Sequence, residues 1–91
     1  MANIDLSRLQ MVNHPLQRPL LVITASGGSL CCGYISVESL NRNGDAAAIV
    51  SGVDDHQQML TAPIKAVSDA AIALGVEFGM TGEEALKRFG A

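Results

Sequence analysis

The pair Cys32-Gly33 is the place in this sequence where residue types and spacing best suggest chemistry. Cys32 precedes Ser36 by four residues, and serine is typical of the residue that caps a helix start. The dipole of such a helix favours the thiolate, which is the nucleophilic form of cysteine, and the adjacent glycine would admit a substrate. Catalysis would also need a base, and the two histidines are His14 and His56. Cys32 and His56 are therefore candidate catalytic residues, and Gly33 is a candidate ligand-binding residue.

A structural explanation of these residues stays open beside the chemical one. A free cysteine commonly serves as a small buried apolar side chain, and His14 has the setting of a solvated loop residue. The run Asp54-Asp55-His56 offers candidate metal ligands, but it lacks the spacing of the well-defined metal motifs. An aspartate that caps a helix start accounts for the two carboxylates without a metal.

Composition and charge exclude several classes of function. The net charge is −3, the basic residues are scattered, and aromatic residues make up 3% of the chain, so we expect no nucleic-acid partner. No apolar run approaches the roughly 20 residues of a membrane span, and the N-terminus does not have the pattern of a signal peptide. Gly27-Gly28 lacks the spacing of a phosphate-binding loop, so we expect no cofactor. Two adjacent cysteines, expected to be free thiols, favour a cytoplasmic location.

The first half of the chain predicts three strands. Residues 3–12 alternate loosely between apolar and polar side chains, and the run 13–15 breaks this pattern at a proline. Residues 19–25 form the second predicted strand, in which the continuous apolar run requires cover on both faces. Residues 26–29 predict a hairpin turn whose two glycines supply positive φ angles. The third predicted strand covers residues 30–35 and contains Gly33, which implies a close approach by another group.

The second half of the chain predicts helices around one further strand. A short helix from Val37 to about Arg42 is followed by a strand within residues 46–51, which suggests a parallel crossover. Asp54 or Asp55 would cap a second helix. Residues 62–74 show helical spacing of apolar side chains, with Pro63 in the first turn. Residues 76–80 are a connector, and the capping box at residues 81–84 starts the last helix.

The predicted fold class is α+β: a two-layer α/β sandwich with a small mixed sheet and helices on one face. Residues 1–91 form a single domain, in which residues 3–35 are the β-rich region and residues 36–91 are the helix-rich covering layer. Hydrophobic residues make up 48% of the chain, and the mean hydropathy is +0.28. Because a domain this small cannot readily hide so much apolar material, we expect another subunit to cover the second face of the sheet.

An ordered set of short motifs resembles the YunC-like family of uncharacterised proteins, a domain of unknown function. The resemblance spans roughly residues 18–90, and Cys32-Gly33 is part of the matched pattern. Its remaining motifs are the stretch 20–37 with its glycine turn, Gly44-Asp45-Ala46-Ala47, Val50, Gly52, Leu60-Thr61-Ala62-Pro63, Val67-Ser68, Ala71, Gly75-Val76, Gly79-Met80, Gly82 and Glu84-Ala85-Leu86. The resemblance implies a small α/β fold with an N-terminal β region, residues 3–35, that mediates assembly into a homotetramer. It implies no reaction and no catalytic residue.

Three functional hypotheses follow from these observations. The first is a homo-oligomeric, non-enzymatic binding or structural module with no nucleic-acid or membrane partner. The second is a small thiol-dependent enzyme with its site around Cys32 at a subunit interface. The third is a metal-binding protein that uses Asp54, Asp55 and His56.

Overall fold

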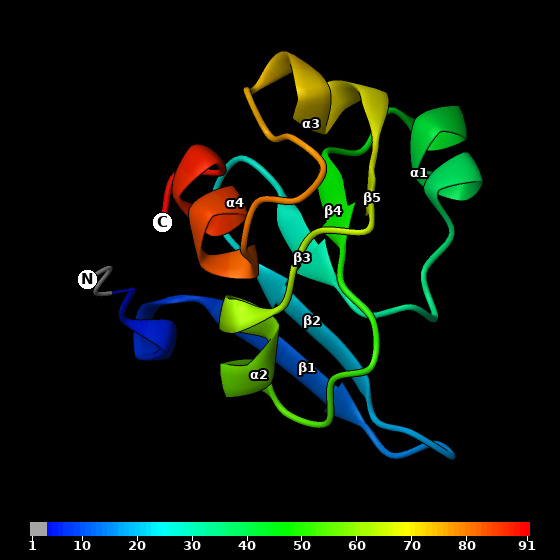
Figure 1. The fold of residues 1–91 in the computed structure, drawn as a ribbon, viewed down its shortest axis with the longest axis vertical. Helices are drawn as coiled ribbons and strands as arrows, with labels where there is room; N and C mark the ends of the chain where they lie inside the picture. The colour runs from blue at the N-terminus through cyan, green and yellow to red at the C-terminus, as the bar shows by residue number, and fades with distance from the viewer. Residues whose placement is uncertain (1–3) are drawn as a thin grey trace.

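The chain folds around a five-stranded sheet with the strand order β1-β2-β3-β4-β5 (Figure 1). The computed structural model describes residues 4–91. Strands β3 and β4 are parallel, and all other neighbouring strands are antiparallel, so the predicted α+β class with a small mixed sheet is confirmed. The elements are η1 (Leu6–Arg8, a 3-10 turn), β1 (Gln10–His14), β2 (Leu20–Thr24), β3 (Ser29–Cys31), α1 (Val37–Asn43), β4 (Ala47–Ile49), α2 (His56–Thr61), β5 (Ala66–Val67), α3 (Asp69–Ala73) and α4 (Gly82–Arg88).

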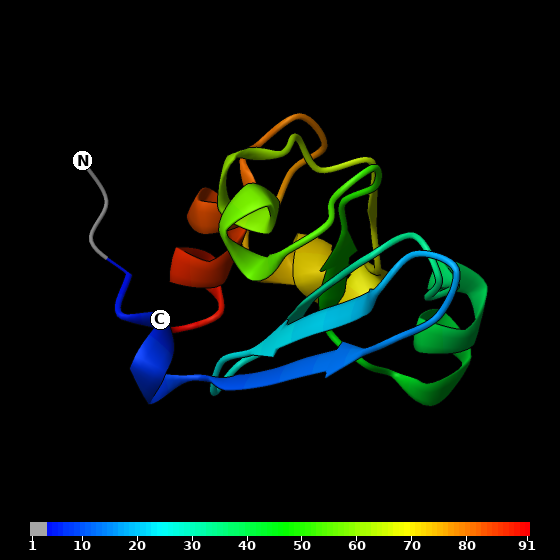
Figure 2. The same cartoon turned by 90° about the horizontal axis from the view of Figure 1, so that it is seen from below.

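Alternating side chains of the central strands divide the interior into two clusters. Leu30 and Ala48 belong to the main core, which also contains side chains of α2, α3 and α4. Cys31, Ala47 and Ile49 face the other way, toward partly buried residues of α1. Strands β3 and β4 are thus covered on both faces, so the expectation that all helices lie on one face is wrong for α1. The apolar run of β2, predicted to need cover on both faces, buries only Leu21 and Ile23, on the side of the main core. Beneath β1 and β2, no α-helix of the described chain is drawn in Figure 2.

The first strand differs from its prediction over residues 3–12. Residues 1–3 lie outside the described part of the chain. Residues 6–8 form η1, which is capped by Asp5 through a 3.1 Å hydrogen bond from the Ser7 N–H. Strand β1 then continues through His14, a residue predicted to lie in a break, because His14 pairs with Leu20 in the hairpin. Pairing with β2 supplies hydrogen-bond partners that the local sequence does not reveal.

The turn between β2 and β3 lies where it was predicted, but its glycines serve a different purpose. Neither Gly27 nor Gly28 has a positive φ angle, so that part of the prediction is wrong. A Cβ at Gly28 would overlap the ring of Phe89 and lie 2.8 Å from the Ala46 oxygen. The Gly27 N–H donates to the Phe89 carbonyl oxygen at 2.7 Å. Glycine is required here because the C-terminal end of α4 packs directly on the turn.

Strand β3 ends at Cys31, four residues before its predicted end. The Cys32 N–H still donates to the Leu21 oxygen at 3.0 Å, but the Cys32 oxygen accepts from the Ile35 N–H and the chain turns away. Gly33 therefore lies in a turn and not inside a strand. The turn leads into α1, whose predicted cap is confirmed, since the Ser36 hydroxyl accepts from the Ser39 N–H. The parallel pairing predicted across this short crossover is also confirmed.

The helix predicted for residues 62–74 is wrong in its first half. Pro63 forms a bridge with Thr81, and β5 pairs with β4 where two helical turns were expected. The helix α3 starts only at Asp69, after the cap Ser68. Apolar residues spaced three or four apart fit a helix face, but Ile64 is buried here in an extended segment. Residues 66–67 are extended although their apolar spacing fits a helix, because pairing with β4 at the edge of the sheet supplies partners for their backbone groups.

The remaining helix starts follow their sequence signals. Asp55 caps α2 by accepting a 2.7 Å hydrogen bond from the Gln58 N–H. Thr81 and Glu84 form the capping box that starts α4, with both reciprocal bonds present. In the described chain, no helix has the length and apolar character needed to cross a membrane.

Candidate functional site

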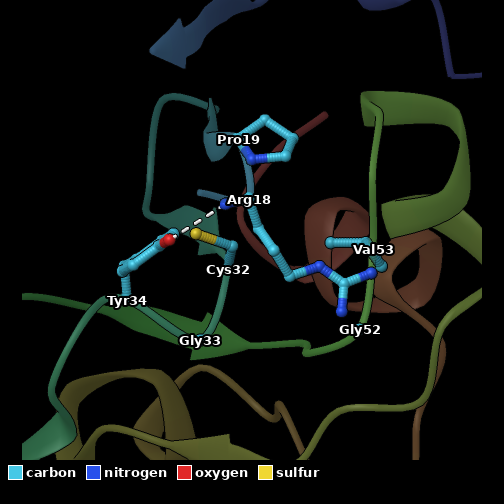
Figure 3. A pocket seen from close by; sticks show the side chains of 7 residues that line it. All are labelled: Arg18, Pro19, Cys32, Gly33, Tyr34, Gly52 and Val53. Carbon is cyan, nitrogen blue, oxygen red and sulfur yellow. Dashed lines mark hydrogen bonds between the residues drawn. The ribbon is translucent and has the colours of Figure 1, made fainter. Parts of the chain in front are cut away.

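A cavity of about 280 Å³ opens at the end of the parallel strand pair (Figure 3). It is lined by Arg18, Pro19, Cys32, Gly33, Tyr34, Gly52 and Val53. A pocket of this size is at the lower limit of the volumes typical of small-molecule sites. Two of the candidate residues from the sequence, Cys32 and Gly33, line this cavity.

Three segments that are distant in sequence build the cavity. Residues 32–34 directly follow β3, and residues 52–53 follow β4. Because β3 and β4 are parallel, the segments after their carboxyl ends meet at one edge of the sheet, which is where open α/β sheets commonly bind ligands. Arg18 and Pro19 come from the loop of the β1–β2 hairpin and complete the wall.

Arg18 ties the three segments together. Its guanidinium Nη2 lies 2.9 Å from Oδ1 of Asp54, which follows the lining residue Val53. Its backbone N–H donates a 3.2 Å hydrogen bond to the Tyr34 hydroxyl oxygen, the bond drawn in Figure 3. Both side chains of the ion pair are more than half exposed, 56% for Arg18 and 60% for Asp54. The pair is therefore of the solvent-screened kind that contributes little stability.

Cys32 is 4% exposed and lines the cavity with its thiol engaged. Its Sγ accepts a 3.3 Å hydrogen bond from the Leu21 N–H. In a regular antiparallel ladder that N–H would donate to the carbonyl of the residue opposite, but the Cys32 carbonyl has turned toward Ile35. The sulfur therefore replaces a backbone acceptor at the point where β3 ends. This gives Cys32 a structural role in addition to its place in the cavity wall.

Cys31 faces the opposite side of the sheet and is excluded from the cavity. It is buried among Ala47, Ile49 and residues of α1. Burial raises the pKa of the Cys31 thiol to about 12, with smaller contributions from Cys32 and Asp45. A thiol held in its neutral form in this way is a poor nucleophile. Both cysteines are free thiols.

The structure does not place His56 beside Cys32. The His56 ring Nε2 lies 2.8 Å from the Val12 carbonyl oxygen of β1, where it can donate as the Nε2–H tautomer. His56 therefore attaches the start of α2 to the sheet. Within residues 4–91, no histidine lines the cavity. Cys32 thus has no histidine base in its immediate surroundings.

Each candidate metal ligand has a separate partner. Asp54 pairs with Arg18, Asp55 caps the Gln58 N–H, and His56 contacts Val12. The Asp54 N–H also donates a 2.8 Å hydrogen bond to the side-chain oxygen of Gln58 in α2. No group of three metal-binding side chains converges anywhere in the described residues. The adjacency of these residues in sequence reflects the construction of a helix start.

Reasoning from the sequence missed most of the cavity wall, including Arg18, Tyr34 and Val53. Tyr34 and Val53 could have been predicted, because the parallel pairing expected from the sequence implies that the residues after both strands lie close together. No local pattern marks Arg18, which reaches the site only through the hairpin loop.

Comparison with known proteins places this architecture in a family context. A family model described as "Domain of unknown function (DUF1805)" matches residues 31–89. The chain is 36% identical over 70 residues to the uncharacterized protein YunC of Bacillus subtilis (strain 168), a match that covers 72% of this chain and 69% of that protein. The crystal structure of a protein of unknown function, TA1206 from Thermoplasma acidophilum, is similar with a TM-score of 0.81 and 27% identity. That likeness covers 90% of this chain and 91% of the other.

Proposed function

Since this chain belongs to the DUF1805 family, a domain of unknown function, we propose that it is a homo-oligomeric, non-enzymatic binding module that takes a small ligand in the cavity after β3 and β4. The cavity is the single observation that carries this proposal. Its wall combines apolar surface from Pro19 and Val53 with a few polar groups, which is the usual composition of a ligand site. The absence of a histidine near Cys32 in the described chain favours binding over thiol catalysis.

Blocking the cavity tests the binding function. We expect low-molecular-weight compounds from a neutral fragment library to shift the backbone amide resonances of Gly33, Tyr34, Gly52 and Val53 in ¹⁵N–¹H spectra. Gly33→Leu should abolish these shifts, since a Cβ at Gly33 meets only the Ser51 Cβ, at 3.6 Å, and the larger side chain then fills the cavity. Ser39→Leu is the matched control, because Ser39 is an exposed residue of α1 outside the cavity. Shifts that persist in Gly33→Leu would place binding elsewhere.

The oligomeric part of the proposal is supported by the outer strands. All five residues of β1 are exposed, and Val12 pairs with Val22, which packs with the second cluster on the face opposite the main core. An exposed edge strand with apolar side chains is a surface that proteins normally cover. A homotetramer formed through this N-terminal β region would cover it. The two free thiols are consistent with our further proposal of a cytoplasmic location.

Mass in solution tests the assembly. Light scattering at micromolar concentration should give four times the 9.5 kDa chain mass. Val12→Lys should lower that mass, because it places a charge on the proposed contact face. Ser39→Lys adds the same charge on α1 and should leave the assembly intact. A monomeric wild-type protein would contradict the proposal.

A thiol-dependent enzyme is the second candidate, and it is favoured by the place of Cys32 in the cavity wall. Its Sγ accepts a hydrogen bond from the Leu21 N–H, which fixes the position of the sulfur in the wall. Alkylation by iodoacetamide at pH 7 tests this candidate, with mass spectrometry to separate Cys32 from Cys31. Reaction faster than that of a free cysteine would support it. Protection of Cys32 until the protein unfolds would exclude it.

A further inference from the structure

The cavity has one charged lining residue among residues 4–91, and that residue is a cation. Arg18 supplies the charge, and no carboxylate belongs to the wall. The neighbouring Asp54 reaches Arg18 from beside Val53 and engages a single guanidinium nitrogen, Nη2. A guanidinium has five N–H donors in a planar fork, so most of its binding capacity is unused. The site therefore has a positive centre with room for a second acceptor.

The other polar side chains of the wall also have donors to offer. The Tyr34 hydroxyl oxygen already accepts from the Arg18 backbone N–H, which leaves its O–H to donate. The Cys32 sulfur already accepts from the Leu21 N–H, which leaves its S–H to donate. Each group already accepts one hydrogen bond from the protein, and its own hydrogen has no acceptor among the described residues. A ligand that fits this wall brings acceptor atoms and a negative charge.

The remainder of the wall fixes the size and character of the rest of the ligand. Pro19, Val53 and the Tyr34 ring supply apolar surface to the wall. In Figure 3, Val53 lies beside the Arg18 guanidinium, and Pro19 and Tyr34 lie farther from it. A volume of 280 Å³ corresponds to about nine water molecules at roughly 30 Å³ each. The space thus suits a compact molecule with a short apolar body and one acidic group.

We propose that the cavity binds a small monocarboxylate, whose carboxylate replaces that of Asp54 on the Arg18 guanidinium while its apolar body contacts Pro19 and Val53. This inference rests on the proposed binding function. The exchange is feasible because the resident ion pair is exposed and weak. A bidentate contact between the Arg18 guanidinium and a ligand carboxylate would use two parallel N–H donors, whereas Asp54 engages a single nitrogen, and the bidentate contact is the stronger arrangement. Asp54 then serves to occupy Arg18 when the ligand is absent.

Titration with a matched pair of probes tests the proposal. Isovalerate and its neutral amide, isovaleramide, share one shape, and only the acid carries a charge. In ¹⁵N–¹H titrations of the full chain at pH 7, the amides of Gly33, Tyr34, Gly52 and Val53 should report isovalerate binding about tenfold tighter than isovaleramide. Equal affinity for the two probes would overturn the carboxylate assignment.

Two variants identify the group responsible. Arg18→Gln should remove the preference for the acid, and Asp54→Asn should tighten isovalerate binding about two- to fivefold, because the competing carboxylate is gone. Arg42→Gln is the control, since Arg42 is another exposed arginine in an ion pair, with Glu38 at 3.7 Å, outside the cavity. Unchanged preference in Arg18→Gln would overturn the role of Arg18.

The outcomes separate this inference from the proposed function. If isovaleramide shifts the cavity amides as strongly as isovalerate does, the cavity is a binding site and the carboxylate inference is wrong. If neither probe nor any neutral fragment shifts them, the binding function of the cavity itself is wrong.

Discussion

Cys31 and Cys32 are neighbours in the sequence, and their thiols lie on opposite faces of the sheet. Strand geometry alone dictates this separation, because successive side chains point to opposite sides. Cys32 lines the cavity and closes the β2–β3 ladder through its sulfur. Cys31 is buried beneath α1, where no polar partner stabilises a thiolate among the described residues. One residue step therefore decides which thiol has access to a ligand.

The buried thiol of Cys31 makes the stability of the protein fall at high pH. Its pKa is raised from the ordinary 9.0 to about 12 by burial, so the folded state holds a proton that the unfolded chain loses above pH 9. The contribution to stability is full below pH 9 and is lost as the pH rises toward 12, at up to about 1.4 kcal/mol per pH unit. Urea unfolding between pH 7.5 and 10.5 should show this decline.

Two variants isolate the contribution of Cys31 to that decline. Cys31→Ala should flatten the dependence of unfolding free energy on pH, while it lowers stability at pH 7.5 by about 1 kcal/mol. Cys32→Ser keeps an acceptor for Leu21 and should retain the wild-type slope. An unchanged slope in Cys31→Ala would assign the alkaline loss to another group.

At the scale of elements, Ser68 connects the helix α3 to the sheet. Its hydroxyl oxygen accepts a 2.9 Å hydrogen bond from the Ala47 N–H of β4 and also caps α3 at the Ala71 N–H. Ser68 is fully buried. A single side chain thus satisfies one buried donor of a strand and one of a helix. This double use explains why the helix starts at Asp69 and not at Pro63.

Removing this hydroxyl should cost more than removing an ordinary cap. Ser68→Ala leaves the buried Ala47 N–H without its acceptor and also removes the cap, so we expect a loss of about 2–4 kcal/mol in unfolding free energy. Ser36→Ala removes only the exposed cap of α1 and should lose about 1 kcal/mol. Denaturant titration of both variants checks the difference. Equal losses would show that the bond to Ala47 contributes nothing.

At the scale of the whole molecule, the C-terminal end of α4 closes against the turn between β2 and β3. The ring of Phe89 is buried on Gly28, and the Phe89 carbonyl oxygen accepts from the Gly27 N–H at 2.7 Å. This contact joins residues 62 positions apart in the chain. It attaches the helical layer to the hairpin that also forms one wall of the main core.

A pair of glycine variants tests this closure. Gly28→Ala places a Cβ into the Phe89 ring and beside the Ala46 oxygen, so it should lose about 1–3 kcal/mol through overpacking. Gly33→Ala meets only the Ser51 Cβ, at 3.6 Å, without backbone strain, and should stay within about 0.5 kcal/mol of wild type. Thermal unfolding of the two variants measures the contrast. Tolerance of alanine at Gly28 would mean that α4 does not pack closely on the turn.

The candidate site shows how far the sequence reaches. Local chemistry singled out Cys32 and Gly33, and both line the cavity. It also proposed His56 as a base, yet that side chain lies on the carbonyl of Val12, where α2 meets β1. Distances between segments that are far apart in sequence depend on how the layers pack, and no spacing rule within one segment reports them.

The sequence by itself determined the features that depend on neighbours within a few residues. Ser36, Asp55 and Thr81 cap their helices as predicted, since each cap bonds an N–H three residues away. The parallel pairing of β3 and β4 also follows from the order of the elements. Only the tertiary structure decided that residues 66–67 form an edge strand, that Gly28 makes room for Phe89, and that Arg18 reaches the cavity. In all three features, the residue is stabilised by a partner that is distant in the sequence, and local propensities contain no information about such partners.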